Sequence, residues 1–430
     1  SYSDQGLNGL SVNFQRHLRD KVITWTKGSL PRPIHYNCWE AIYFEHEPNN
    51  LSEIMELAAD IGAERFVLDD GWFGTRDDDT QSLGDWEIDP RKYPEGLGPL
   101  ITKVNQFGMS FGIWFEPEMV NLNSKLYAKH PSWILGPIDQ VLGRNQLLLD
   151  MANPNVQEYL FKKISAILTD HNVNYIKWDH NRVLPHVDAA QTYRTYELMS
   201  RLRDKFPNVE IESCASGGGR IDFGILKYTQ RVWLSDTNDA LERLRIQHQA
   251  SNFLPMAVTG SHVGPRKCHT SGRIHNLEFR AWVAAQRLMG FEMDPRELTP
   301  DELSSLKHIT QWWKDNRIWR HDADIHRLNV ADNSITAEIQ VSRNQDKFVT
   351  FVGLAKTSKW SCPIPIRLTG LRPDYRYHVS LLNYREKTTA SRGGSVFDKG
   401  EMDVSGQYLM ANGIILPSQF PDRMWVLEGT

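Results

Sequence analysis

One short segment combines a lysine and an aspartate in a way that suggests chemistry. Residues 175–179 read as a short buried strand, after which the chain becomes polar. Residues two apart in a strand share a face, so Lys177 and Asp179 are predicted to point the same way. A nearby ammonium lowers the pKa of a carboxylate. Asp179 is therefore a candidate nucleophile, and a structural ion pair with Lys177 is the alternative interpretation.

A second carboxylate, Asp236, ends a later apolar run. Glycoside cleavage with retention needs one carboxylate to attack the anomeric carbon and another to protonate the leaving oxygen. The two must have pKa values that their surroundings push apart. Lys177 would keep Asp179 ionised, whereas no cation is evident beside Asp236 in the sequence. Asp239 competes for the acid role, but its spacing to Glu242 fits a capping box and predicts a helix start.

Further residue types suit the binding of a sugar. Asp69 and Asp70 precede a glycine at a tight turn and offer paired acceptors for vicinal hydroxyls, although a solvated loop is the alternative. A tryptophan presents a flat apolar face and one N–H donor, which suits a pyranose ring, and core packing is an equal alternative for any one of them. The tryptophans at or near predicted strand ends are Trp39, Trp72, Trp114 and Trp178. Glycines 217–219 allow close backbone approach to a ligand.

Composition excludes several other classes of protein. The chain has 430 residues and a net charge of −4, so it has no basic field for nucleic acid or anionic lipid. No apolar run reaches the roughly 18 residues of a membrane span. The four cysteines lie far apart, which favours reduced thiols and a cytoplasmic location. No histidine, cysteine or acidic spacing fits a standard zinc or calcium site, so no metal is expected.

Short apolar runs alternate with helical periods over about 300 residues, which predicts a (β/α)8 barrel. The expected strands are residues 34–39, 65–68, 111–115, 175–179, 209–212, 231–235, 253–258 and 288–293, with an extra strand at 147–149. The first helix is expected to be capped by Asn50 with Glu53 and to stop at Gly62. Polar residues follow the strands, where barrel enzymes place their chemistry.

The alternation changes to period two beyond about residue 325, which predicts an antiparallel β-sandwich domain. The expected organisation is a lead-in segment over residues 1–30, the barrel over 31–324 and the β domain over 325–430.

Five segments together resemble the bacterial-type α-galactosidases of glycoside hydrolase family 36. They are residues 68–74, 112–119, 177–182, 212–220 and 233–236. The resemblance implies a retaining mechanism with Asp179 as nucleophile and Asp236 as general acid/base. It also implies that a set of residues lines the galactose subsite: Trp39, Asp69, Asp70, Trp114, Arg144, Lys177, Asn181, Cys214 and Gly217. Within it, Asp69 and Asp70 would hold the 4- and 6-hydroxyls.

The implied activity is hydrolysis of terminal α-linked galactose in oligosaccharides such as melibiose and raffinose, without a cofactor. The partner is then a small oligosaccharide, with no nucleic acid or membrane and a possible homo-oligomer. The sequence lacks the N-terminal β-sandwich usual in this family, and residues 261–269 fit its pattern only loosely. The alternatives are an α-N-acetylgalactosaminidase, a galactosyl-transferring relative or a catalytically silent sugar-binding fragment. A Mg²⁺-dependent barrel using Asp69, Glu116, Asp179 and Glu212 is a further rival.

Overall fold

The computed structural model describes residues 2–26, 30–186, 188–360, 362–383, 395, 397, 400–418 and 420–430. The chain divides into two compact units. One comprises residues 22–236 with 290–303, and the other comprises residues 1–21, 237–289 and 304–430. No helix in the described part of the chain is long and apolar enough to cross a membrane.

Eight parallel strands form a closed barrel in the order β1-β10-β9-β8-β7-β6-β3-β2. They are β1 (His35–Asn37), β2 (Arg65–Leu68), β3 (Ser110–Phe115), β6 (Tyr175–Trp178), β7 (Glu210–Ser213), β8 (Arg231–Trp233), β9 (Thr259–Val263) and β10 (Leu288–Phe291). The predicted class, a (β/α)8 barrel followed by an antiparallel β domain, is confirmed. The extra strand is also confirmed, since β5 (Gln146–Leu148) pairs with β4 (Met119–Asn121) in a separate antiparallel ribbon.

Two local predictions are wrong. The seventh strand was expected over residues 253–258, but that stretch contains Pro255 and a 3₁₀ turn at Met256–Val258, and the strand follows it as β9. A proline has no N–H to donate to a neighbouring strand, which excludes it from a central strand. The first barrel helix is capped by Glu47 rather than Asn50, because Pro48 supplies a first helical residue that needs no N–H partner.

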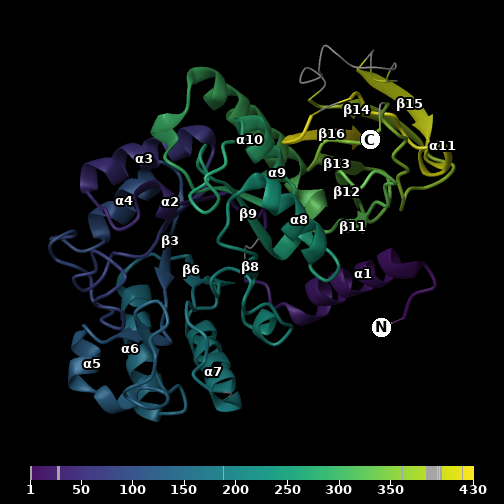
Figure 1. The fold of residues 1–430 in the computed structure, drawn as a ribbon. Coiled ribbons are helices and arrows are strands. Elements are labelled where there is room, and N and C mark those ends of the chain that lie inside the picture. Colours follow the sequence, from purple (N-terminus) through teal and green to yellow (C-terminus); the bar gives the residue numbers. More distant parts are fainter. Residues whose placement is uncertain are drawn as a thin grey trace. The chain divides into compact units, whose positions relative to one another are not determined.

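Helices around the barrel bury the apolar faces that the sequence predicts. Leu51, Ile54, Ala58 and Ile61 of α3 are all buried, and Gly62 ends this helix with φ +106°. The helices of the unit that comprises residues 22–236 are α2 (Trp39–Ile42), α3 (Pro48–Ile61), α4 (Gly98–Gln106), α5 (Lys125–Lys129), α6 (Pro154–Asp170) and α7 (Ala189–Lys205). Figure 1 shows α6 and α7 side by side next to β6.

The strand register brings the ends of neighbouring barrel strands to one level. Trp114 of β3 lies opposite Lys177 of β6, and Lys177 lies opposite Glu212 of β7. Residues that directly follow these strands therefore share one edge of the barrel, the carboxyl-terminal edge.

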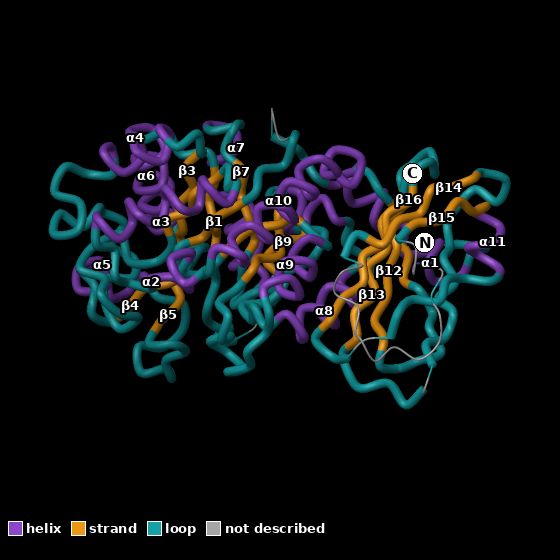
Figure 2. Tube along the Cα trace, turned by 90° about the horizontal axis from the view of Figure 1, so that it is seen from above, coloured by secondary structure: helices purple, strands orange, loops and turns teal. Residues whose placement is uncertain are grey.

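The second unit contains α1 (Gly6–His17), α8 (Ala240–Ala250), α9 (Leu277–Ala285), α10 (Pro300–His321), most of which lies in it, and α11 (Gly406–Ala411). Six of its strands form one antiparallel sheet in the order β11-β12-β13-β16-β14-β15. They are β11 (Asp324–Arg327), β12 (Ile335–Val341), β13 (Phe348–Leu354), β14 (Arg376–Leu381), β15 (Glu401–Ser405) and β16 (Arg423–Gly429). Figure 2 labels β12, β13, β14, β15 and β16 of this sheet.

The polar residues of β12 are buried as well as its apolar ones. The carboxylate of Glu338 accepts two hydrogen bonds from the Arg287 guanidinium, and Gln340 accepts one from Arg320. Buried charges are stable when they are paired and hydrogen-bonded. Period two therefore identifies the strand correctly here, although its polar face is not solvated.

Candidate active site

Asp179 directly follows β6 and is held in a dense set of hydrogen bonds. Its Oδ2 accepts from Trp114 Nε1 at 3.2 Å and from Asn181 Nδ2 at 2.7 Å, and its Oδ1 accepts from the backbone N–H of His180 at 2.8 Å. The side chain is buried, with 6% of the residue exposed. The carboxylate is therefore fixed in orientation by donors on β3 and on the segment that follows β6.

Burial by itself would raise the pKa of Asp179, but its surroundings more than reverse this effect. The positive charge of Lys177 and hydrogen bonds from Asn181 and Cys214 hold the pKa below its usual range. Asp179 is thus an ionised, desolvated carboxylate near neutral pH. This is the state that a carboxylate nucleophile requires.

Lys177 acts on Asp179 through its charge, but its direct ion-pair partner is Asp69. Lys177 Nζ lies 2.8 Å from Asp69 Oδ2, which also accepts from Asn37 Nδ2 at 2.6 Å. The strand register explains the difference, since the long lysine side chain reaches the carboxylate that follows β2. Within the described chain Lys177 forms its ion pair with Asp69, and the expected direct Lys177–Asp179 pair does not form.

Asp70 is clamped by an arginine that the sequence did not single out. Both of its carboxylate oxygens accept from Arg76, at 2.7 and 2.8 Å, and Arg76 also donates to Asn121. Burial still raises the pKa of Asp70 despite this guanidinium. Each carboxylate oxygen has two lone pairs, so Asp70 retains acceptor capacity for a further donor.

Asp236 has the opposite electrostatic character to Asp179. Its side chain is open to solvent at the site, yet the protein packed around it and the negative charge of Asp179 raise its pKa to about 6. A carboxyl group with such a pKa carries a proton under mildly acidic conditions. The two groups thus differ in the way that an acid and a nucleophile must differ.

Gly217 sets the position of the backbone beside Asp236. It has φ +82°, and a Cβ at this position would lie 2.4 Å from the Cα of Ser235. The sequence predicts a glycine run that approaches a ligand, and the structure shows that Gly217 also approaches the backbone of Ser235, just after β8. Only glycine fits this contact.

The other predicted subsite residues also belong to this unit. Trp39 is half-buried and stands edge-on to Tyr43 and Phe44, with ring centroids 4.9 and 5.1 Å apart. Cys214 follows β7 and is fully buried. Arg144 is exposed, and its positive charge lowers the pKa values of Asp70, Glu116 and Asp236. These electrostatic contacts place Arg144 near the carboxylates.

Two further buried acidic residues act on this site: Glu116, which the sequence offered only as a ligand of the rival magnesium arrangement, and Glu292, which sequence reasoning missed. Glu116 follows β3 and is fully buried, and burial together with the negative charge of Asp179 raises its pKa. Glu292, just after β10, is buried and acts electrostatically on Lys177 and Asp236. Their positions at strand ends are a signal that the sequence carries. The rival magnesium arrangement receives no support, because Asp69 and Glu212 are paired with Lys177 and Arg231 instead.

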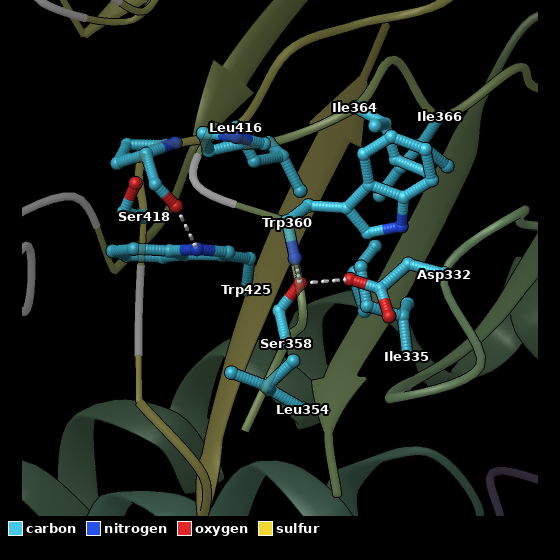
Figure 3. Close-up of a pocket in the computed structure, with 13 residues that line it drawn as sticks. Asp332, Ile335, Leu354, Ser358, Trp360, Ile364, Ile366, Leu416, Ser418 and Trp425 are labelled. Carbon is cyan, nitrogen blue, oxygen red and sulfur yellow. Dashed lines mark hydrogen bonds between the residues drawn. The ribbon is translucent and has the colours of Figure 1, made fainter. Parts of the chain in front are cut away.

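Two cavities differ in what they could bind. One, of about 760 Å³, is lined by the segments after β6 and β7, including Asn181 and Ser216. The other, of about 90 Å³, lies in the second unit between Trp360 and Trp425, where Ser358 donates a hydrogen bond to Asp332 (Figure 3). Asp332 is the one carboxylate among its described lining residues. This second cavity therefore lacks the pair that glycoside cleavage needs.

The barrel and its two contrasting carboxyl groups resemble those of barrel glycoside hydrolases. The melibiase family pattern matches residues 1–321, and the C-terminal domain pattern of glycosyl hydrolase family 36 matches residues 335–427. The chain belongs to this family.

Curated relatives and solved structures support the assignment of the chain to glycosyl hydrolase family 36. The chain is 40% identical to an alpha-galactosidase of Escherichia coli, over 98% of this chain and 61% of that protein, and 36% identical to alpha-galactosidase AgaA of Geobacillus stearothermophilus, over 99% and 59%. The galactosidase domain of the alpha-galactosidase-sucrose kinase AgaSK superposes with a TM-score of 0.91 at 33% identity, over 100% of this chain and 59% of that one. An AgaA variant in complex with raffinose gives 0.90 at 33%, over 100% and 60%. The chain therefore spans about three fifths of the length of these relatives.

Proposed function

We propose that the chain is a retaining α-galactosidase that removes terminal α-linked galactose from small oligosaccharides such as melibiose and raffinose. The observation that carries the proposal is the contrast between two carboxyl groups of one unit: the pKa of Asp179 is lowered and that of Asp236 is raised to about 6. Relatives named as alpha-galactosidases, one of them crystallised with raffinose, support the choice of sugar.

In the first step a carboxylate oxygen of Asp179 attacks the anomeric carbon and forms a glycosyl ester. The bond from that carbon to the leaving oxygen breaks, and Asp236 donates its proton to this oxygen. In the second step the ionised Asp236 takes a proton from water, and the water oxygen attacks the anomeric carbon. The ester bond breaks, so that galactose is released and both carboxyl groups return to their starting states.

The remaining subsite residues receive roles that fit their contacts. Asp69 and Asp70 accept hydrogen bonds from the 4- and 6-hydroxyls, and Lys177 and Arg76 hold these two carboxylates in place. Trp39 and Trp114 offer flat faces to the ring. The other proposed contacts come from Arg144, Lys177, Asn181, Cys214 and Gly217. The cavity beside Asn181 has a volume within the range of ligand pockets, although neither Asp179 nor Asp236 is among its described lining residues.

A release assay with three aryl glycosides tests the proposal. We expect the α-galactoside to be hydrolysed much faster than the α-glucoside or the α-N-acetylgalactosaminide. Preferred release of N-acetylgalactosamine would instead identify an α-N-acetylgalactosaminidase. Galactose binding without release would identify a silent sugar-binding protein, and release of galactose onto a second sugar would identify a transferring relative.

We further propose the segment boundaries at residues 30/31 and 324/325, a homo-oligomer and a cytoplasmic location. The pattern matches, which divide between residues 321 and 335, support the second boundary. Four cysteines outside any disulfide in the described chain fit a reducing compartment. Limited proteolysis, analytical ultracentrifugation and cell fractionation test these three points.

A further inference from the structure

Glu116 and Glu118 lie two residues apart after β3 and have very different surroundings. Glu118 accepts hydrogen bonds from Arg220, Trp178 and Thr195, and this environment lowers its pKa to about 2 despite its burial. Within the described chain, Glu116 has no lysine or arginine at ion-pair distance. A fully buried carboxylate without such a partner is costly, and the usual response is to keep the proton.

Two neighbours contact the carboxyl group of Glu116. Its Oε1 accepts from the backbone N–H of Asn181 at 2.5 Å, and its Oε2 lies 3.1 Å from the side-chain amide nitrogen of Gln146. The carbonyl oxygen of Gln146 is itself buried without a hydrogen-bond partner. A half-turn of that amide, which exchanges its oxygen and nitrogen, brings an acceptor to Glu116 Oε2. A proton on Oε2 can then be donated to Gln146.

The charged groups around Glu116 come from three other segments. Asp179 follows β6 and is negative, whereas Arg144 and Arg76 belong to the segments before β5 and after β2 and are positive. Burial is the largest effect and Asp179 the next, and together they outweigh Arg144 and the hydrogen bonds from Asn181 and raise the pKa of Glu116 to about 8. Glu116 is therefore mostly protonated at neutral pH.

Asn181 connects Glu116 to Asp179. Its backbone N–H donates to Glu116 Oε1, and its side-chain Nδ2 donates to Asp179 at 2.7 Å. Its Oδ1 accepts from Ser216 at 3.0 Å. A residue fixed at three points can orient the carboxylate that it contacts. A negative charge on Glu116 would oppose the ionisation of Asp179, whereas a neutral acid anchors Asn181 without this penalty.

We propose that Glu116 is a positioning residue, a carboxylic acid that shares its proton with Gln146 and anchors Asn181, and through Asn181 orients Asp179 for attack. The catalytic part of this inference rests on the proposed function. The protonation of Glu116 and the hydrogen bond to Asn181 do not depend on it. The two parts can therefore be tested separately.

Two substitutions separate the neutral acid from a charged one. Glu116→Gln keeps an acceptor for Asn181 and gains an amide donor for the carbonyl of Gln146, so it reproduces the neutral acid. On an aryl α-galactoside, we expect Glu116→Gln to keep most of the wild-type kcat, whereas Glu116→Leu loses it. A displacement of about 1 Å can cost about 10²-fold in rate, so we expect Glu116→Leu to lower kcat by about that factor, with a much smaller change in KM.

Infrared spectroscopy at pH 7 observes the proton directly. At this pH Asp236, with a pKa of about 6, is mostly ionised, whereas Glu116 is mostly protonated. The carbonyl stretch of a protonated carboxyl group is expected in the wild-type protein and should disappear in Glu116→Gln. Glu118→Gln is the matched control, because it removes an ionised glutamate of the same segment and should leave this band in place.

The kinetics and the infrared band decide whether Glu116 acts as a neutral acid or as a charged group. A Glu116→Gln variant that is folded by circular dichroism but as slow as Glu116→Leu would overturn the proposal, because it would show that a charge is required. An unchanged carboxyl band in Glu116→Gln would overturn it as well. If the wild-type protein releases no galactose, the proposed function fails, yet the infrared band still decides whether Glu116 is neutral. If Glu116→Leu does not fold, the kinetics and the band of Glu116→Gln still decide the matter.

Discussion

The proton on Glu116 makes the stability of the fold depend on pH in a particular direction. The pKa is about 8 in the folded chain and 4.5 for an ordinary glutamate. Below pH 4.5 the group is protonated in both states and its contribution to stability is fully present. Between pH 4.5 and 8 the unfolded chain loses the proton while the folded chain keeps it, so this stability is progressively lost.

The size of the effect follows from the same two values. Each pH unit in this window costs about 1.4 kcal/mol of unfolding free energy, and the whole window corresponds to on the order of 5 kcal/mol. Glu116→Gln cannot titrate, so it is free of this loss. We expect the unfolding free energy of the variant to exceed that of the wild type by an amount that grows from pH 4.5 to 8 and is then constant.

Chemical denaturation of both proteins at a series of pH values measures this difference. Glu118→Gln serves as the control with the opposite sign, because the pKa of Glu118 is lowered to about 2 and its stabilisation is present above pH 4.5 and lost as the pH falls. Glu118→Gln should therefore be less stable than the wild type at pH 7. Parallel curves for the wild type and Glu116→Gln across the window would refute the assignment of a neutral Glu116.

Four further predictions concern the two carboxylates and their supports. Asp179→Ala should abolish turnover on an aryl α-galactoside, and azide should restore part of it as a galactosyl azide product. The wild-type kcat/KM should fall as the pH rises above about 6, because Asp236 must be protonated to act as the acid. Lys177→Met should raise the pKa of Asp179 and so move the acidic limb of that profile to higher pH. Gly217→Ala should lower the unfolding free energy by about 1–3 kcal/mol, measured by denaturation, because its Cβ would overlap Ser235.

The barrel could be predicted because its signals are local. Apolar runs that end in acidic residues identified β2, β3 and β6 to within a residue or two of their observed limits. The strand predicted over residues 253–258 was wrong for a local reason too. The apolar residues around Pro255 resemble a strand in composition but cannot pair as one.

The charge state of the site could not be predicted, because it depends on contacts between distant segments. The partner of Lys177 is 108 residues away, and Glu116 meets Asn181 and Gln146 across 65 and 30 residues. Glu116 and Glu118 lie in one short segment, yet Glu116 is neutral and Glu118 is ionised, because only Glu118 forms an ion pair with an arginine. The residue type is the same at both positions, so the sequence alone could not predict this difference.

The tight contact at Gly217 bears on attempts to redesign the sugar preference. The segment after β7 lies against the backbone of Ser235, immediately before Asp236. Exchanging this glycine segment for one that recognises another substituent would displace Asp236, the proposed proton donor. A successful redesign would have to exchange the segment after β7 and the segment that carries Asp236 together. The sugar preference and the pKa of Asp236 would then change together.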